Sequence, residues 1–214
     1  MNINHDEKTQ VARLLSFLLS GEKVAHRCSV KQAKICNDES KKRFLIRQSR
    51  QERFHAITFQ AAILWLTPKG VNNPAKKQMQ QYESVLEKSI DNKDLLNSIV
   101  GLQVILEGMG DIALLHFNHA INQRGFGYQK IRKTILAQED SHHQFGLNHI
   151  AAHKDTTRSC ADTANYLSLI NDIFISFETL FDAFDKDSSD YLAQFHRNLP
   201  AWMRNDALGY HPDA

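Results

Sequence analysis

The sequence predicts an all-α protein, a ferritin-like four-helix bundle with one long crossover and extra C-terminal helices. Glycine and proline are scarce, at nine and four in 214 residues. Aromatic and β-branched residues do not alternate over long runs, and apolar residues instead recur at the three- and four-residue spacing of helices. The length suits one domain, 1–214, with a core bundle at about 7–153 and C-terminal helices at about 163–198.

Composition and charge indicate a soluble globular chain. Apolar residues make up 42% and charged residues 23%, and the net charge is only +2, so we expect no nucleic-acid partner. The apolar run at 11–21 follows two acids and contains an arginine, so we expect neither a signal peptide nor a membrane span. Three cysteines without a C-x-x-C pair favour a reducing, cytoplasmic location and exclude a rubredoxin-like site.

The first two expected helices run at about 7–36 and from a turn near 36–40 to about Leu66. The Thr67-Pro68-Lys69-Gly70 segment ends the second, because proline and glycine stop helices. The stripe of the first helix consists of Val11, Leu14, Leu15, Leu18, position 22 and Ala25. The stripe of the second consists of Leu45, Gln48, Glu52, His55, Phe59, Ala62 and Leu66.

The connection at 71–92 contains a polar amphipathic helix at about 75–90, and a link of this length lets the next helix run parallel to the previous one. A third bundle helix is expected at about 93–122 and a fourth at about 128–153, separated by a turn containing Gly125. The stripe of the third consists of Leu96, Val100, Val104, Glu107, Asp111, Leu114, Asn118 and Ile121. That of the fourth consists of Ile131, Ile135, Glu139, His142, Gly146 and His149.

The C-terminal part adds one strongly apolar helix and a shorter one near 188–198, which Pro200 should end. The apolar face of the longer helix consists of Ile170, Ile173, Phe174, Phe177, Leu180, Phe181 and Phe184. The last fourteen residues are expected to form an irregular strap. Two antiparallel helix pairs joined by one long crossover are typical of the ferritin-like bundle.

Four of the nine glutamates lie on the apolar stripes of four successive helices, and they are Glu22, Glu52, Glu107 and Glu139. Burial of a lone carboxylate costs several kcal/mol, so a core that contains four of them needs cations. No lysine or arginine is patterned to supply these cations. Counting residues from each turn, at about 1.5 Å per residue, places the two members of each pair at nearly the same depth.

Histidines complete the pattern, because His55 follows Glu52 by three residues and His142 follows Glu139 by three. One glutamate from each of two helices and Glu-x-x-His from each of the other two form the ligand set of di-iron and di-manganese proteins. Four carboxylates balance two divalent cations, and carboxylate with imidazole suits Fe or Mn. The alternative is four core acids satisfied by scattered Arg, Tyr or His side chains.

The segments GEKVAHR (21–27), RQERFHA (50–56), ILEGMGD (105–111) and QEDSHHQFG (138–146) together resemble the ferritin-like di-iron superfamily, over about 150 of 214 residues. The long crossover and the added C-terminal helices are similar to those of the aldehyde-deformylating oxygenases, whereas the compact form also resembles the demethoxyubiquinone hydroxylases. The resemblance implies two Fe ions, or Mn/Fe, bound by Glu22, Glu52, His55, Glu107, Glu139 and His142. It also implies dioxygen, a small organic substrate, an external reductase or ferredoxin, and an arrangement compatible with a homodimer.

Several neighbouring residues leave two interpretations open. Asp111 either accepts a hydrogen bond from a ligand histidine or is solvated, and His149 either adds a ligand or is simply packed. His143 should face a neighbouring helix or solvent, and Glu178 should lie on the surface. Glycines 101, 108, 110 and 146 either leave space beside the metals or allow close helix contact.

The expected function is an oxygen-activating oxidoreductase, an oxygenase or oxidase with a largely apolar substrate. Iron storage is less favoured, because some sixty residues follow the fourth helix. A rubrerythrin-like peroxidase would need the C-x-x-C domain that the chain lacks, and a purely structural bundle would bind no transition metal.

Overall fold

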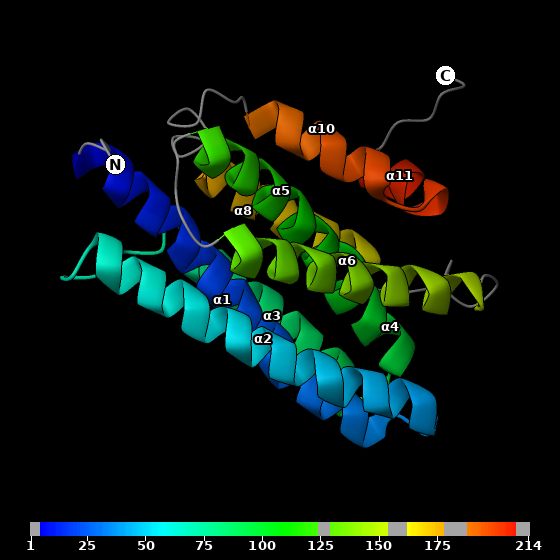
Figure 1. Ribbon diagram of the computed structural model, residues 1–214. Helices are drawn as coiled ribbons and strands as arrows, with labels where there is room; N and C mark the ends of the chain where they lie inside the picture. The colour runs from blue at the N-terminus through cyan, green and yellow to red at the C-terminus, as the bar shows by residue number, and fades with distance from the viewer. Residues whose placement is uncertain (1–4, 124–128, 154–161, 178–187, 209–214) are drawn as a thin grey trace.

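The computed structural model describes residues 5–123, 129–153, 162–177 and 188–208, and every regular element in these ranges is helical (Figure 1). Helices α1 (His5–Ile35) and α2 (Glu39–Leu66) form the first long pair and lie side by side along one edge of the molecule. Asp38 caps α2, because its carboxylate accepts hydrogen bonds from the backbone N–H groups of Ser40 (2.8 Å) and Lys41 (3.0 Å). The predicted helix pair and its turn are confirmed.

The crossover is made by α3 (Lys76–Asp91), as the sequence predicts, and the chain then enters one long helical stretch. That stretch consists of α4 (Leu95–Ile99), a π-helical segment η1 (Val100–Leu106) and α5 (Glu107–Gln123). The π-helical segment is a departure from the predicted α-helix. All seven of its residues are buried, and the hydroxyl of Tyr82 donates to the carbonyl of Gly101 inside it at 2.7 Å. Segments of this kind occur often at functional sites, and this one ends at Glu107.

Helix α6 (Gln129–Ala151) completes the bundle by packing against η1 and α5. The apolar stretch Leu95–Asn118 is long enough to cross a membrane, but 83% of its most apolar window is buried inside the protein. It is therefore a core helix. This burial explains why its hydrophobicity continues around the whole helix.

The C-terminal part contributes α8 (Thr163–Ser176), α10 (Ser188–Asn198) and α11 (Ala201–Leu208), which lie along the side of α5 and α3 (Figure 1). The prediction of an irregular strap is wrong for 201–208. Pro200 directly precedes α11, its carbonyl accepts from the N–H of Met203 at 2.9 Å, and the Met203 side chain is buried. Of the apolar face predicted for α8, the described residues Ile170, Ile173, Phe174 and Phe177 are buried. Leu180, Phe181 and Phe184 lie outside the described residues.

Candidate metal centre

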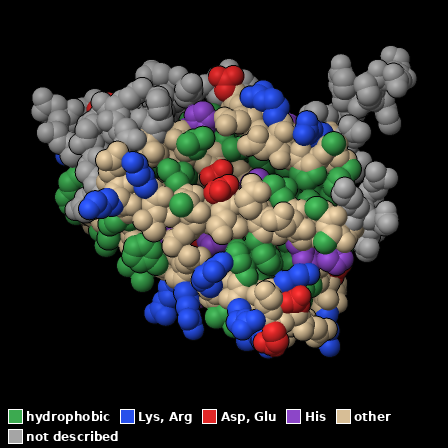
Figure 2. Space-filling model, turned by 45° about the vertical axis from the view of Figure 1, so that its right-hand side comes forward, with side chains coloured by type: hydrophobic (Ala, Val, Ile, Leu, Met, Phe, Trp, Pro, Cys, Tyr) green, Lys and Arg blue, Asp and Glu red, His purple; other side chains and the backbone are tan. Residues whose placement is uncertain are grey.

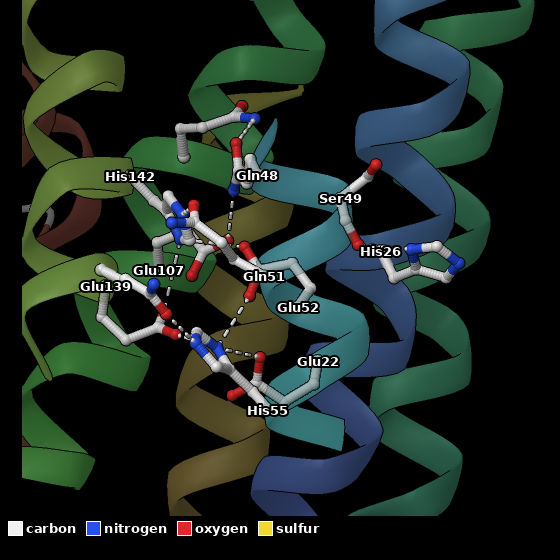
Figure 3. A network of polar contacts seen from close by, with 12 residues as sticks. Glu22, His26, Gln48, Ser49, Gln51, Glu52, His55, Glu107, Glu139 and His142 are labelled. Atoms are coloured by element: carbon white, nitrogen blue, oxygen red, sulfur yellow. Dashed lines mark hydrogen bonds and ion pairs between the residues drawn. The ribbon is translucent and has the colours of Figure 1, made fainter. Parts of the chain in front are cut away.

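Six side chains from four helices meet in the middle of the bundle (Figure 3). They form two overlapping groups in which one potential ligand atom per residue lies within 4.8 Å of the others. The groups are Glu22, Glu52, His55 and Glu139, and Glu52, Glu107, Glu139 and His142. Glu52 and Glu139 belong to both groups, so each could contribute a ligand to either ion. These six residues are the ones that the sequence singles out, and none is more than 7% exposed.

The nitrogen Nδ1 of each histidine faces the carboxylates. In His55 it lies 2.8 Å from Glu139 Oε1 and 3.2 Å from Glu22 Oε2, and in His142 it lies 2.9 Å from Glu52 Oε1. Both oxygens of Glu52, Oε1 of Glu139 and Nδ1 of His142 are buried close to one another, yet none of them makes a hydrogen bond of good geometry with a described residue. Buried lone pairs that face one another in this way are satisfied by cations. The donor set therefore fits two metal ions.

The protonation behaviour of the protein part supports the same conclusion. Burial, with the charge of Glu139, raises the pKa of Glu22 well above its usual range, and burial with the charge of Glu52 does the same for Glu107. Burial alone would raise the pKa of Glu52, but the ring nitrogens of His142 and His55 outweigh it and lower that pKa. The four acids thus cannot all be ionised together without added positive charge.

The opposite ring nitrogens are held by two glutamines that the sequence analysis did not single out. His55 Nε2 donates to Gln138 Oε1 at 2.7 Å, and His142 Nε2 donates to Gln51 Oε1 at 2.9 Å. Each glutamine accepts the hydrogen bond from the histidine of the other helix. Because Nε2 keeps its proton in these bonds, a ring that gives up its other proton presents the Nδ1 lone pair to a metal. Gln51 and Gln138 immediately precede Glu52 and Glu139, so the repeated motif is Gln-Glu-x-x-His, a signal that was present in the sequence.

Asp111, for which the sequence left open a supporting hydrogen bond or solvation, makes no hydrogen bond to a ligand histidine. Its carboxyl group is half-buried, and the hydrogen bonds expected from the ligand histidines go to the glutamines instead. Burial, with the charge of Asp140, raises the pKa of Asp111 to about 6. Asp111 therefore lies near the site without supporting a ligand.

A chain of buried amides orients one carboxylate. Gln48 Nε2 donates to Glu107 Oε1 at 2.8 Å, and Gln48 Oε1 accepts from Gln103 Nε2 at 3.0 Å. Gln103 also donates to Gln32 Oε1 at 2.8 Å. All three glutamines are fully buried. Gln48 lies on the predicted stripe of α2, and its position as a polar residue on a mainly apolar stripe could have indicated this role in the sequence.

The two remaining histidines of α6 lie outside both ligand groups. His143 is buried against α5, and a Cβ added at Gly108 would lie 3.2 Å from its Nε2, so it faces a neighbouring helix rather than solvent. His149 is buried beside Phe145 and His153, with ring centroids 6.3 Å and 4.6 Å away. It is packed and is not an added ligand. Glu178 lies outside the described residues.

The glycines divide between the two interpretations. A Cβ added at Gly146 would lie 2.7 Å from Cβ of Gln103, and one added at Gly101 would lie 2.6 Å from the Tyr166 ring, so both allow close packing. A Cβ at Gly110 would meet nothing within 4 Å. Gly110 lines a small cavity of about 30 Å³ between α1 and α5, which also reaches Glu22, Glu107 and Glu139.

Comparison with known proteins supports the architecture. No protein-family profile matches the chain, and no curated protein matches its sequence. A solved structure described as protein 19 with aldehyde deformylating oxidase activity, from Synechococcus, matches with a TM-score of 0.78. The match covers 97% of this chain and 93% of that chain at 18% sequence identity. At this identity the likeness shows the fold, and the predicted ferritin-like bundle is confirmed.

Proposed function

We propose that this protein is an oxygen-activating di-metal oxidoreductase that oxidises a small, largely apolar organic molecule. The observation that carries the proposal is the pair of overlapping ligand groups that share Glu52 and Glu139. Carboxylate and imidazole donors without a thiolate favour iron or manganese, and we propose two Fe ions. The likeness of the fold to a protein with aldehyde deformylating oxidase activity supports this choice.

The two ligand groups lie at opposite ends of the site, and each would hold one ion. Glu22 and His55 would hold one ion, Glu107 and His142 the other, and Glu52 would bridge them together with Glu139. When bound, the ions supply the electron transfer to dioxygen that side chains alone cannot perform. Burial of every ligand keeps bulk water away from this chemistry.

The protein part holds the ligands in position before any ion arrives. Gln51 and Gln138 fix the orientation of both imidazole rings through the hydrogen bonds at Nε2. Gln48 restrains Glu107 in the same way. These bonds leave Nδ1 and the carboxylate oxygens as the groups free to bind metal.

The cavity beside the carboxylates supports an apolar substrate. It is lined mainly by side chains such as Phe17, Leu106 and Met109, and Glu107 lies on its wall. A volume of about 30 Å³ matches one molecule as small as dioxygen or water. A larger substrate would enter only by displacing the side chains that line the cavity. The wall at Gly110 has no side chain, so less material would have to move there.

The proposal is tested by removing one ligand. His142→Ala or Glu139→Ala is expected to lose most of the bound metal and all oxygen-dependent turnover. Elemental analysis with anomalous diffraction at the Fe and Mn edges measures the metal and identifies it. The matched control is His149→Ala, because His149 is equally buried on the same helix but outside both ligand groups.

Two outcomes would contradict the proposal. If either ligand variant keeps two metals per chain, the site assignment is wrong. If the purified protein forms a particle of many subunits that accumulates an iron mineral, iron storage replaces the oxidoreductase function.

A further inference from the structure

We propose that the outer face of α2, together with the groove between α2 and α6, is the docking surface for an acidic protein that carries single electrons, such as a [2Fe–2S] ferredoxin. This inference rests on the proposed function, because a di-metal oxidoreductase needs a reductant and the sequence contains no flavin or iron–sulfur motif. The docking face consists of the outward side of α2 from Arg43 to Trp65 and the adjoining groove.

The groove brings the surface close to the metal ligands. It has a volume of about 560 Å³, and its lining includes Arg47 and Gln51 from α2 and Lys133 and Gln138 from α6. Gln51 and Gln138 are only half-buried, while the histidines behind them are fully buried. A single hydrogen bond, 2.9 Å or 2.7 Å long, joins each glutamine to a ligand histidine. The groove therefore offers a short bonded route from the surface to the site.

The docking face carries positive charge that no ion pair with another described residue neutralises. Four arginines of α2 and one lysine of α6 are exposed and form no ion pair with another described residue: Arg43, Arg47, Arg50, Arg53 and Lys133. The acids of α2 do not offset them, because Glu39 pairs with Lys42 and Glu52 is buried in the metal site. Such a surface attracts and orients an acidic partner.

The same helix exposes apolar side chains that suit a protein partner. Five of the seven large hydrophobic residues exposed in the described ranges lie on α2: Ile46, Phe54, Ile57, Leu64 and Trp65. In the lower half of Figure 2, where α1 and α2 lie, hydrophobic side chains are interspersed with Lys and Arg. Protein interfaces combine aromatic and arginine contacts in this way. A second copy presenting the same face would set arginines against arginines, which argues against a symmetric dimer here.

The electron count requires repeated, short-lived docking. Each [2Fe–2S] ferredoxin gives up one electron and is oxidised. Two docking events in succession therefore supply the two electrons that return two Fe(III) ions to Fe(II). An interface built on exposed charges releases its partner quickly enough for this exchange.

The test compares two double charge reversals. Arg47→Glu with Lys133→Glu changes the docking face, and the control, Lys77→Glu with Lys88→Glu, makes the same change in net charge on exposed positions of α3. Binding of oxidised ferredoxin is measured by calorimetry at low and at physiological ionic strength, on metal-free and metal-loaded protein. We expect binding to weaken about tenfold in the docking-face variant and less than about twofold in the control. Salt should weaken wild-type binding.

A kinetic measurement separates docking from chemistry. The rate of reduction by ferredoxin, divided by the rate of reduction by dithionite, is expected to fall about tenfold in the docking-face variant only. If dithionite reduction yields no reaction with dioxygen, the proposed function fails, and the calorimetry still decides whether the face binds ferredoxin.

Three results would overturn the docking proposal. The first is that the wild-type protein does not bind ferredoxin. The second is that binding weakens equally in both double variants, which would show an effect of net charge alone. The third is loss of binding to anionic phosphatidylglycerol vesicles in the docking-face variant while ferredoxin binding is unchanged. That result would make the face a membrane-binding surface.

Discussion

Replacing Glu107 by glutamine is expected to stabilise the metal-free protein, and the gain should grow as pH rises. Glu107 is buried, and its ligand oxygen lies within 4.8 Å of those of Glu52 and Glu139. Burial and the charges of those two carboxylates raise the pKa of Glu107 well above its ordinary value of 4.5. The folded chain therefore keeps a proton that the unfolded chain loses near that ordinary value.

The magnitude is set by proton linkage. Between the ordinary pKa and the raised one, the folded state binds one more proton than the unfolded state, so the free energy of unfolding falls by about 1.4 kcal/mol per pH unit. Above the ordinary value of 4.5 this loss continues with each pH unit until the raised pKa is reached. Glutamine does not titrate, and its carbonyl can still accept the hydrogen bond from Gln48. Glu107→Gln should therefore gain about 1.4 kcal/mol relative to the wild type for each pH unit above 4.5, and almost nothing near pH 4.5.

Urea unfolding of chelator-treated protein over this pH range measures the effect. The control Glu39→Gln neutralises an exposed glutamate and should change the free energy of unfolding by less than about 0.5 kcal/mol, with no such growth. Added metal should stabilise the wild type more than Glu107→Gln, because the variant lacks one charged ligand. A gain that does not increase with pH, or no gain at all, would refute the argument that buried acids destabilise the metal-free fold.

Three further perturbations test the surroundings of the site. Gln138→Leu leaves the Nε2–H of His55 without its acceptor and should weaken metal affinity about 10- to 100-fold, measured by competition with a chromogenic chelator; unchanged affinity would contradict the supporting role. Gly110→Ala should raise the free energy of unfolding by up to about 1 kcal/mol, because the added Cβ meets no other atom. Gly146→Ala should lower it by about 1–3 kcal/mol, because its Cβ would collide with Gln103. Denaturant melts in which both variants shift the free energy of unfolding in the same direction would refute this contrast. Asp111→Asn should stabilise the protein by about 1–2 kcal/mol at neutral pH, allowing for partial solvent screening. The pKa of the wild-type carboxyl is about 6 in the folded protein and 3.8 in the unfolded chain, so the wild-type protein becomes less stable as pH rises between these values. The gain from Asp111→Asn should therefore vanish near pH 4 in urea titrations.

The ligand set was predictable because burial of carboxylates is costly enough to leave a pattern in the sequence. Glu22 and Glu107 were recognisable only as acids on mainly apolar stripes, and Glu-x-x-His spacing marked the other two helices. Matching depth was then expected from the constant rise of a helix. All six residues lie together in the structure.

Periodicity failed where the backbone departs from the α-helix. The stripe drawn through 93–122 assumes 3.6 residues per turn, but η1 is π-helical and buried on every side. No polar face exists there to reveal the change of pitch. The helix near 188–198 does end before Pro200, as predicted, but residues 201–208 form α11 where an irregular strap was expected, because a proline also suits the start of a helix.

The sequence by itself determined the four bundle helices, their connectivity and the six residues that meet in the candidate metal centre, because these depend on local spacing and on the cost of burying charge. Tertiary structure decided how those residues are shared. Only the packing of α2 against α6 places Glu52 and Glu139 in both candidate ligand groups and brings Gln51 and Gln138 to the histidines of the opposite helix. Contacts between helices depend on relative position in three dimensions, which spacing along one helix does not encode.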